Sequence, residues 1–145
     1  MNMKMKLLPP EMRDWYFPFD WCPERLWALD VPTEVRDISE LRWHFDVPIW
    51  GSAKGKHFDL CPSEVLHNPS RFPQHDDKIE ACDISFPIDM MFTIDRFAII
   101  DGIHRLAKHE KLGLTEVKVR IVPRELIPLF ESNWREEPAI ARDGL

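Results

Sequence analysis

Residues 97–114 read FAIIDGIHRLAKHEKLGL and carry the clearest structural signal in the chain. An apolar run ends in Asp101-Gly102, and a His-Arg pair follows at the start of a helical pattern. The pattern closes with Gly113 and then Leu114, the residue order of a left-handed helix C-cap. The stretch therefore predicts a strand, a tight turn and a helix in direct succession.

Two further strands are expected around this unit. FPIDMMFTI (86–94) is apolar and mostly β-compatible, and Asp95-Arg96 can turn the chain back into residues 97–100, which predicts a hairpin. EVKVRIV (116–122) alternates between apolar and charged residues and predicts a half-buried strand with Lys118 and Arg120 on its solvent face.

The first half of the chain predicts short, interrupted elements, because 13 prolines stand against 5 glycines. The elements expected there and at the C-terminal end are a strand at 26–32, a helix at 37–45 capped by Asp37 or Ser39, a helical turn from Ser63, a helix at 75–84 with Ile79 and Cys82 inward, and a final helix at 124–130. We expect an α+β fold with a small mixed sheet and short helices.

Length, composition and charge narrow the class of protein. The 145 residues suit one domain, and 44% apolar with 30% charged residues is a globular composition. No apolar run approaches the length of a membrane span, and three cysteines without C-x-x-C spacing suit a reducing compartment. The sequence thus favours a cytoplasmic protein without a membrane partner. A net charge of −6 does not favour nucleic-acid binding.

The N-terminal region is rich in aromatic residues and proline. Residues 1–24 are expected to form an extended Pro/Trp-rich arm over the core, and the alternative is a partner surface for a protein or a second copy of the chain. We expect three parts: an N-terminal extension packed on the core (1–56), a central domain (57–130) and a C-terminal tail (131–145).

The turn at Asp101-Gly102 is the candidate site. A helix start offers backbone N–H groups, and a glycine there lets an anion approach them. Arg105 supplies a planar fork for phosphate oxygens and His104 a second donor. Asp101 would cap the helix, hold Arg105 or take part in a Mg²⁺-phosphate site. The alternative is a plain turn and cap with a solvated His-Arg face.

The same segment resembles the ParB/sulfiredoxin-like superfamily. In that superfamily a strand runs into a Gly-x-[His/Arg]-Arg turn, a helix ends in Leu-Gly-Leu and a Val-x-Val strand follows, and here AIIDGIHR, LAKHEKLGL and EVKVRIV take these places. DLCPSEVLHNPSRF (59–72) and FPIDMMF (86–92) are similar to its upstream segments. The resemblance spans residues 57–123.

What the resemblance implies is a ParB/sulfiredoxin-like fold and a nucleotide site. Its nucleotide-phosphate residues would be Gly102, Ile103, His104, Arg105 and Arg71. Asp101 matches the aspartate of the free-serine kinases. Ile103 stands where sulfiredoxin needs a cysteine, so sulfinic-acid reduction is not expected.

Three functions follow as hypotheses. The first is a small-molecule phosphotransferase that uses ATP, ADP or CTP with Mg²⁺, with Asp101 and Glu64 as acid–base candidates and Asp101 as the metal ligand. The second is a non-catalytic, nucleotide-responsive binding module. The third, a ParB-like nuclease or DNA-binding protein, is disfavoured by the acidic charge. A structural zinc at His57 and Cys61 is also disfavoured, because no second ligand pair has zinc-site spacing.

Overall fold

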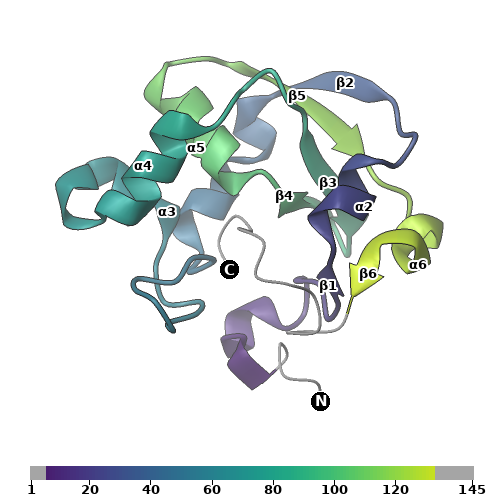
Figure 1. The fold of residues 1–145 in the computed structure, drawn as a ribbon, viewed down its shortest axis with the longest axis horizontal. Coiled ribbons are helices and arrows are strands. Elements are labelled where there is room, and N and C mark those ends of the chain that lie inside the picture. Colours follow the sequence, from purple (N-terminus) through teal and green to yellow (C-terminus); the bar gives the residue numbers. More distant parts are fainter. Residues whose placement is uncertain (1–5, 133–145) are drawn as a thin grey trace.

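The computed structural model describes residues 6–132, which form a small α+β protein with two sheets and short helices (Figure 1). In Figure 1, α3, α4 and α5 gather on one side of the molecule, and α2, α6 and the small sheet lie on the other. No helix within residues 6–132 is long and apolar enough to cross a membrane.

The main sheet has four strands in the order β2-β5-β3-β4. These strands are β2 (Thr33–Asp37), β5 (Glu116–Ile121), β3 (Ile88–Thr93) and β4 (Arg96–Asp101). The central pair β5–β3 is parallel, and both outer pairs are antiparallel. The sheet is therefore mixed, as predicted.

The predicted hairpin of β3 and β4 is confirmed, with its turn one residue earlier than expected. Thr93 pairs with Arg96, so Ile94 and Asp95 form the turn, not Asp95 and Arg96. Ile94 has φ 55°, a left-handed conformation that a β-branched residue rarely adopts, and its side chain is 64% exposed. The tight strand pairing holds Ile94 in this conformation without burying it.

The three helices on the same side of the molecule are α3 (Pro62–His67), α4 (Pro73–Ala81) and α5 (Ile103–Lys111). The predicted C-cap of α5 is confirmed: Gly113 has φ 72°, and Leu114 N donates to His109 O over 3.0 Å. Ile79 is buried in α4 as expected, whereas Cys82 lies just past the helix and is half-buried. The helix α5 contacts β3, which places its first turn beside the main sheet.

Two predictions for the first half of the chain are wrong. Residues 26–32 do not form a strand: Pro23 starts the helix α2 (Pro23–Trp27), where its missing N–H costs nothing, and the strand begins only at Thr33. Residues 37–45 form two 3₁₀ turns, η2 (Ile38–Glu40) and η3 (Arg42–Asp46), in place of one helix. The cap from Asp37 is present, since Ser39 N donates to Asp37 Oδ1 over 2.8 Å.

The N-terminal and C-terminal ends of the described chain meet in the second sheet. It pairs β1 (Asp20–Trp21) with β6 (Glu131–Ser132) in antiparallel fashion, next to α6 (Ile127–Phe130). The remaining 3₁₀ turns are η1 (Pro10–Met12), η4 (Pro69–Arg71) and η5 (Arg124–Leu126). The expected C-terminal tail lies outside the described residues from position 133 onward.

The aromatic arm is part of the hydrophobic core. Trp15, Tyr16, Phe17 and Trp21 are all buried and belong to one continuous cluster with the sheet and helices. Residues 33–37, which lie within the expected extension, supply the edge strand β2. The first 56 residues and the central segment thus share one sheet and one core.

Candidate functional site

The strand-to-helix turn is held closed by its own side chains. Gly102 has φ 123°, and a Cβ there would lie 2.9 Å from Arg105 Nη2 and 3.1 Å from Ile88 Cγ1. A side chain at this position would be strained and would collide with the guanidinium. The glycine therefore makes room for Arg105 and Ile88, a role that the sequence did not predict.

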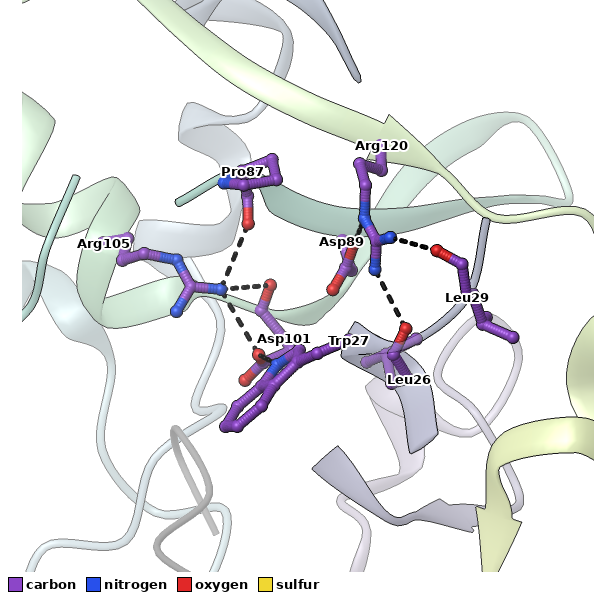
Figure 2. Close-up of polar contacts among 8 residues, drawn as sticks. All are labelled: Leu26, Trp27, Leu29, Pro87, Asp89, Asp101, Arg105 and Arg120. Atoms are coloured by element: carbon purple, nitrogen blue, oxygen red, sulfur yellow. Dashed lines mark hydrogen bonds and ion pairs between the residues drawn. The ribbon is translucent and has the colours of Figure 1, made fainter. Parts of the chain in front are cut away.

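Arg105 reaches back across the turn. Its Nη2 donates to Pro87 O over 3.3 Å, to Asp101 O over 3.4 Å and to Asp101 Oδ2 over 3.3 Å (Figure 2). The Arg105 side chain is 12% exposed, and its Nε is buried without a hydrogen-bond partner in the described structure. The Arg105 guanidinium thus uses Nη2 for contacts within the protein, while its Nη1 donates no hydrogen bond among residues 6–132.

Asp101 connects the turn to the N-terminal half of the chain. Its Oδ2 accepts a hydrogen bond of 2.8 Å from Trp27 Nε1 in addition to the one from Arg105 (Figure 2). The carboxylate is 5% exposed and 74 residues away from Trp27 in sequence. Of the roles considered for Asp101, holding Arg105 is the one that the geometry displays.

The surroundings of Asp101 do not fit a magnesium ion. Mg²⁺ requires several oxygen ligands in octahedral geometry, whereas Asp101 Oδ2 accepts hydrogen bonds from an indole N–H and a guanidinium. Within residues 6–132 no group of three or more His, Cys, Asp or Glu side chains could hold a metal ion.

His104 points away from Arg105. It is buried, stacks on Trp50 at 4.2 Å between ring centroids, and places Nε2 2.9 Å from Nδ1 of His75 in α4. His75 Nε2 lies 2.7 Å from Gly51 O and must donate to that carbonyl. When both rings are neutral, His104 Nε2–H therefore donates to His75 Nδ1. Burial is the main cause that lowers the pKa of His75.

Consecutive residues in a helix project about 100° apart, which explains this divergence. The two side chains therefore face different sides of α5, His104 toward His75 and Arg105 toward Asp101, and do not converge on one phosphate position as expected. Ile103 is buried and belongs to the core.

Glu64 and Arg71 lie in other surroundings. Glu64 Oε2 accepts a hydrogen bond of 2.8 Å from Cys61 N at the start of α3, which is a helix cap. Arg71 is exposed and lies over the ring of Phe72 at 5.6 Å from the ring centroid. Neither residue belongs to the group of contacts drawn in Figure 2.

The structure adds one buried ion pair that was not predicted. Arg120, expected on the solvent face of its strand, is 8% exposed, and its Nε donates to Asp89 Oδ1 over 2.6 Å. Its Nη1 and Nη2 donate to Leu29 O and Leu26 O over 2.8 and 2.9 Å (Figure 2). Burial is the main cause that raises the pKa of Asp89, and the Arg120 hydrogen bond opposes it. An aspartate within an otherwise apolar strand is the sequence signal for such a partner.

A cavity of about 500 Å³ opens beside these two arginines. Its lining comes from α2, β2, β3, β5, α5 and the segments next to them: Trp27, Val31, Thr33, Phe86, Pro87, Asp89, Arg105 and Arg120. Trp27 and Phe86 are 51% and 62% exposed, so part of each ring is accessible to a ligand. The cavity therefore combines apolar rings with two arginines, of which Arg120 is already bonded to Asp89 and two carbonyls while Arg105 Nη1 has no acceptor among residues 6–132, so Arg105 is the group that could bind an anionic ligand.

Comparison of the chain with protein-family models, with curated proteins and with solved structures found no match in any of the three sets.

Proposed function

We propose that this protein is a nucleotide-binding module with a ParB/sulfiredoxin-like fold, and that the nucleotide occupies the cavity lined by Trp27, Phe86, Arg105 and Arg120. The observation that carries the proposal is this cavity beside Arg105, the one residue of the Asp101-Gly102-Ile103-His104-Arg105 turn that lines it. The resemblance of residues 57–123 to that superfamily supports the same placement of the phosphates beside Arg105.

The two walls of the cavity have separate roles in this proposal. Arg105 keeps its contacts with Asp101 through Nη2 and donates to phosphate oxygens from Nη1. The exposed rings of Trp27 and Phe86 offer stacking surfaces for the base. The base would then lie near the N-terminal half of the chain and the phosphates near α5.

Binding without phosphotransfer is the better-supported form of the proposal. Asp101 already accepts from Trp27 and Arg105, and Asp89 is paired with Arg120. Glu64 is used as a helix cap. Each of these three carboxylates thus makes a structural contact. One of them would have to break that contact before it could act as a general base on an acceptor hydroxyl.

The test is isothermal titration calorimetry with ATP, ADP and CTP on matched phenylalanine variants. Phe86→Ala removes a cavity wall, and Phe92→Ala removes a ring of comparable exposure, 50%, outside the cavity. We expect Phe86→Ala to weaken nucleotide binding about tenfold, the effect of one lost stacking partner, and Phe92→Ala to leave it unchanged.

Two outcomes would contradict the proposal: no binding of any of the three nucleotides, or equal effects of Phe86→Ala and Phe92→Ala. Turnover of the bound nucleotide in the presence of hydroxyl acceptors would restore the phosphotransferase hypothesis. Arg105→Lys keeps the charge but loses the planar fork, and it should weaken binding as well.

A further inference from the structure

A second cavity, of about 300 Å³, lies on the His104 side of α5 and is rich in basic groups. It is lined by the loop at 51–57 and by α4: Gly51, Ala53, Lys54, Gly55, Lys56, His57, Gln74, His75 and Lys78. Three lysines and two histidines face one small space, and no aspartate or glutamate is among these residues. The charge around this cavity is therefore positive, although the net charge of the whole chain is −6.

The lysines of this cavity differ from those elsewhere in the helices. Lys108 Nζ donates to Glu80 O and Cys82 O over 2.8 Å, and Lys111 Nζ lies 3.0 Å from Asp76 Oδ1. In contrast, the side chains of Lys54, Lys56 and Lys78 make no hydrogen bond or ion pair within residues 6–132. Three ammonium groups around one cavity therefore have no protein acceptor in the described part of the chain, and they can attract and donate to an anionic ligand.

The loop that carries two of these lysines is held in a fixed shape. Ser52 N and Oγ donate to the two carboxylate oxygens of Asp59 over 2.8 and 2.7 Å, which closes the base of the loop. A Cβ on Gly51 would collide with the carbonyl oxygen of Lys56, so the loop folds back tightly on itself. His75 Nε2 fastens Gly51 O to α4. The cavity is thus formed before any ligand arrives, which lowers the entropic cost of binding.

We propose that the cavity of Lys54, Lys56 and Lys78 is a binding site for a multiply charged phosphate-type anion, separate from the nucleotide cavity. Compact ammonium groups bind phosphate oxygens as point charges, and three of them match an anion with several negative charges. His57 and His75 also line the cavity, but both ring nitrogens of His75 are already bonded, to His104 and to Gly51 O, so the lysines carry the anion contacts. The proposal does not depend on the nucleotide site, because none of its lining residues is shared.

The test is calorimetric titration of the full chain with pyrophosphate at constant ionic strength. Lys54→Gln/Lys56→Gln and Lys78→Gln remove cavity lysines, and Lys118→Gln is the matched control because Lys118 is an exposed lysine outside both cavities. We expect each cavity variant to weaken pyrophosphate binding by about tenfold or more and Lys118→Gln to have no effect. All these lysines are exposed, so unchanged melting temperatures without ligand should show that the variants fold.

Three results would overturn the proposal. These are an absence of pyrophosphate binding, an equal loss with Lys118→Gln, and citrate binding as tightly as pyrophosphate, which would remove the preference for phosphate. The variant Phe86→Ala separates the two sites: it should weaken nucleotide binding and leave pyrophosphate binding intact. A loss of pyrophosphate binding in Phe86→Ala but not in the lysine variants would place the anion in the nucleotide cavity instead.

Discussion

Acidification should destabilise this protein through one buried histidine, His44. The ring is fully buried, its Nδ1 lies 2.7 Å from Leu41 O, and Ile99 N donates to its Nε2 over 3.0 Å. Nδ1 must therefore carry the proton and Nε2 the lone pair. A second proton on Nε2 would face the N–H of Ile99. The fold thus requires neutral His44, and burial is the main cause that lowers its pKa to about 3.

The size of the effect follows from proton linkage. A base whose pKa is lowered by folding is protonated first in the unfolded chain, so its contribution to stability is complete above the unfolded pKa and is lost as the pH falls. With values of 6.5 unfolded and about 3 folded, the free energy of unfolding should drop by about 2 kcal/mol between pH 7 and pH 5. The loss continues until the pH reaches the folded value. This is a large share of the stability of a domain of this size.

The assay is urea unfolding followed by tryptophan fluorescence at several pH values, for the wild type and for His44→Gln. The variant cannot titrate at this position, and its amide can keep part of the hydrogen bonding. His75, whose pKa is also lowered, affects both proteins alike and cancels in their difference. The stability advantage of the wild type should therefore shrink by about 2 kcal/mol from pH 7 to pH 5. A difference that stays constant with pH would refute the assignment of a neutral, buried His44.

Three substitutions test other parts of the fold by urea unfolding. Trp27→Phe should cost about 1 kcal/mol, because it removes the hydrogen bond to Asp101 and keeps most of the ring; no loss would mean that water replaces the contact. Ile94→Asn should stabilise the protein by about 1 kcal/mol, since asparagine tolerates positive φ and the side chain of Ile94 is 64% exposed, so that little buried surface is lost; a loss of stability would contradict the strain. Asp89→Asn should cost about 3 kcal/mol by leaving Arg120 uncompensated, and Asp89→Asn with Arg120→Met should recover part of that loss.

The parts of the fold that the sequence predicts are those with local signals. The β3–β4 hairpin and the strand β5 follow from runs of apolar and alternating residues, and the end of α5 follows from Gly113. Each signal lies within a few residues of the structure that it specifies. The residue types of the turn between β4 and α5, together with the resemblance to a known superfamily, predict a phosphate site there, but neither could orient its side chains.

The remaining features depend on contacts between distant segments. Arg120 is buried because β5 pairs in parallel with β3, which brings it opposite Asp89, 31 residues earlier. Trp27 reaches Asp101 across 74 residues because α2 lies beside the end of β4. Strand alternation alone assigns Arg120 to solvent, since it contains no information about what covers that face. The cavity walls were missed for the same reason.

The divergence of His104 and Arg105 links the two proposed sites through one helix turn. Arg105, which is paired with Asp101, lines the proposed nucleotide cavity, whereas His104 contacts His75, which lines the basic cavity. An anion beside His75 would favour protonation of that ring and thereby change its hydrogen bond with His104. The Arg105–Asp101 and His104–His75 hydrogen bonds both involve the first turn of α5. A shift of that turn would therefore change the geometry of both cavities. Coupling between them would then appear as a changed nucleotide affinity in the presence of pyrophosphate, and thermodynamic reciprocity requires the converse change to have the same factor.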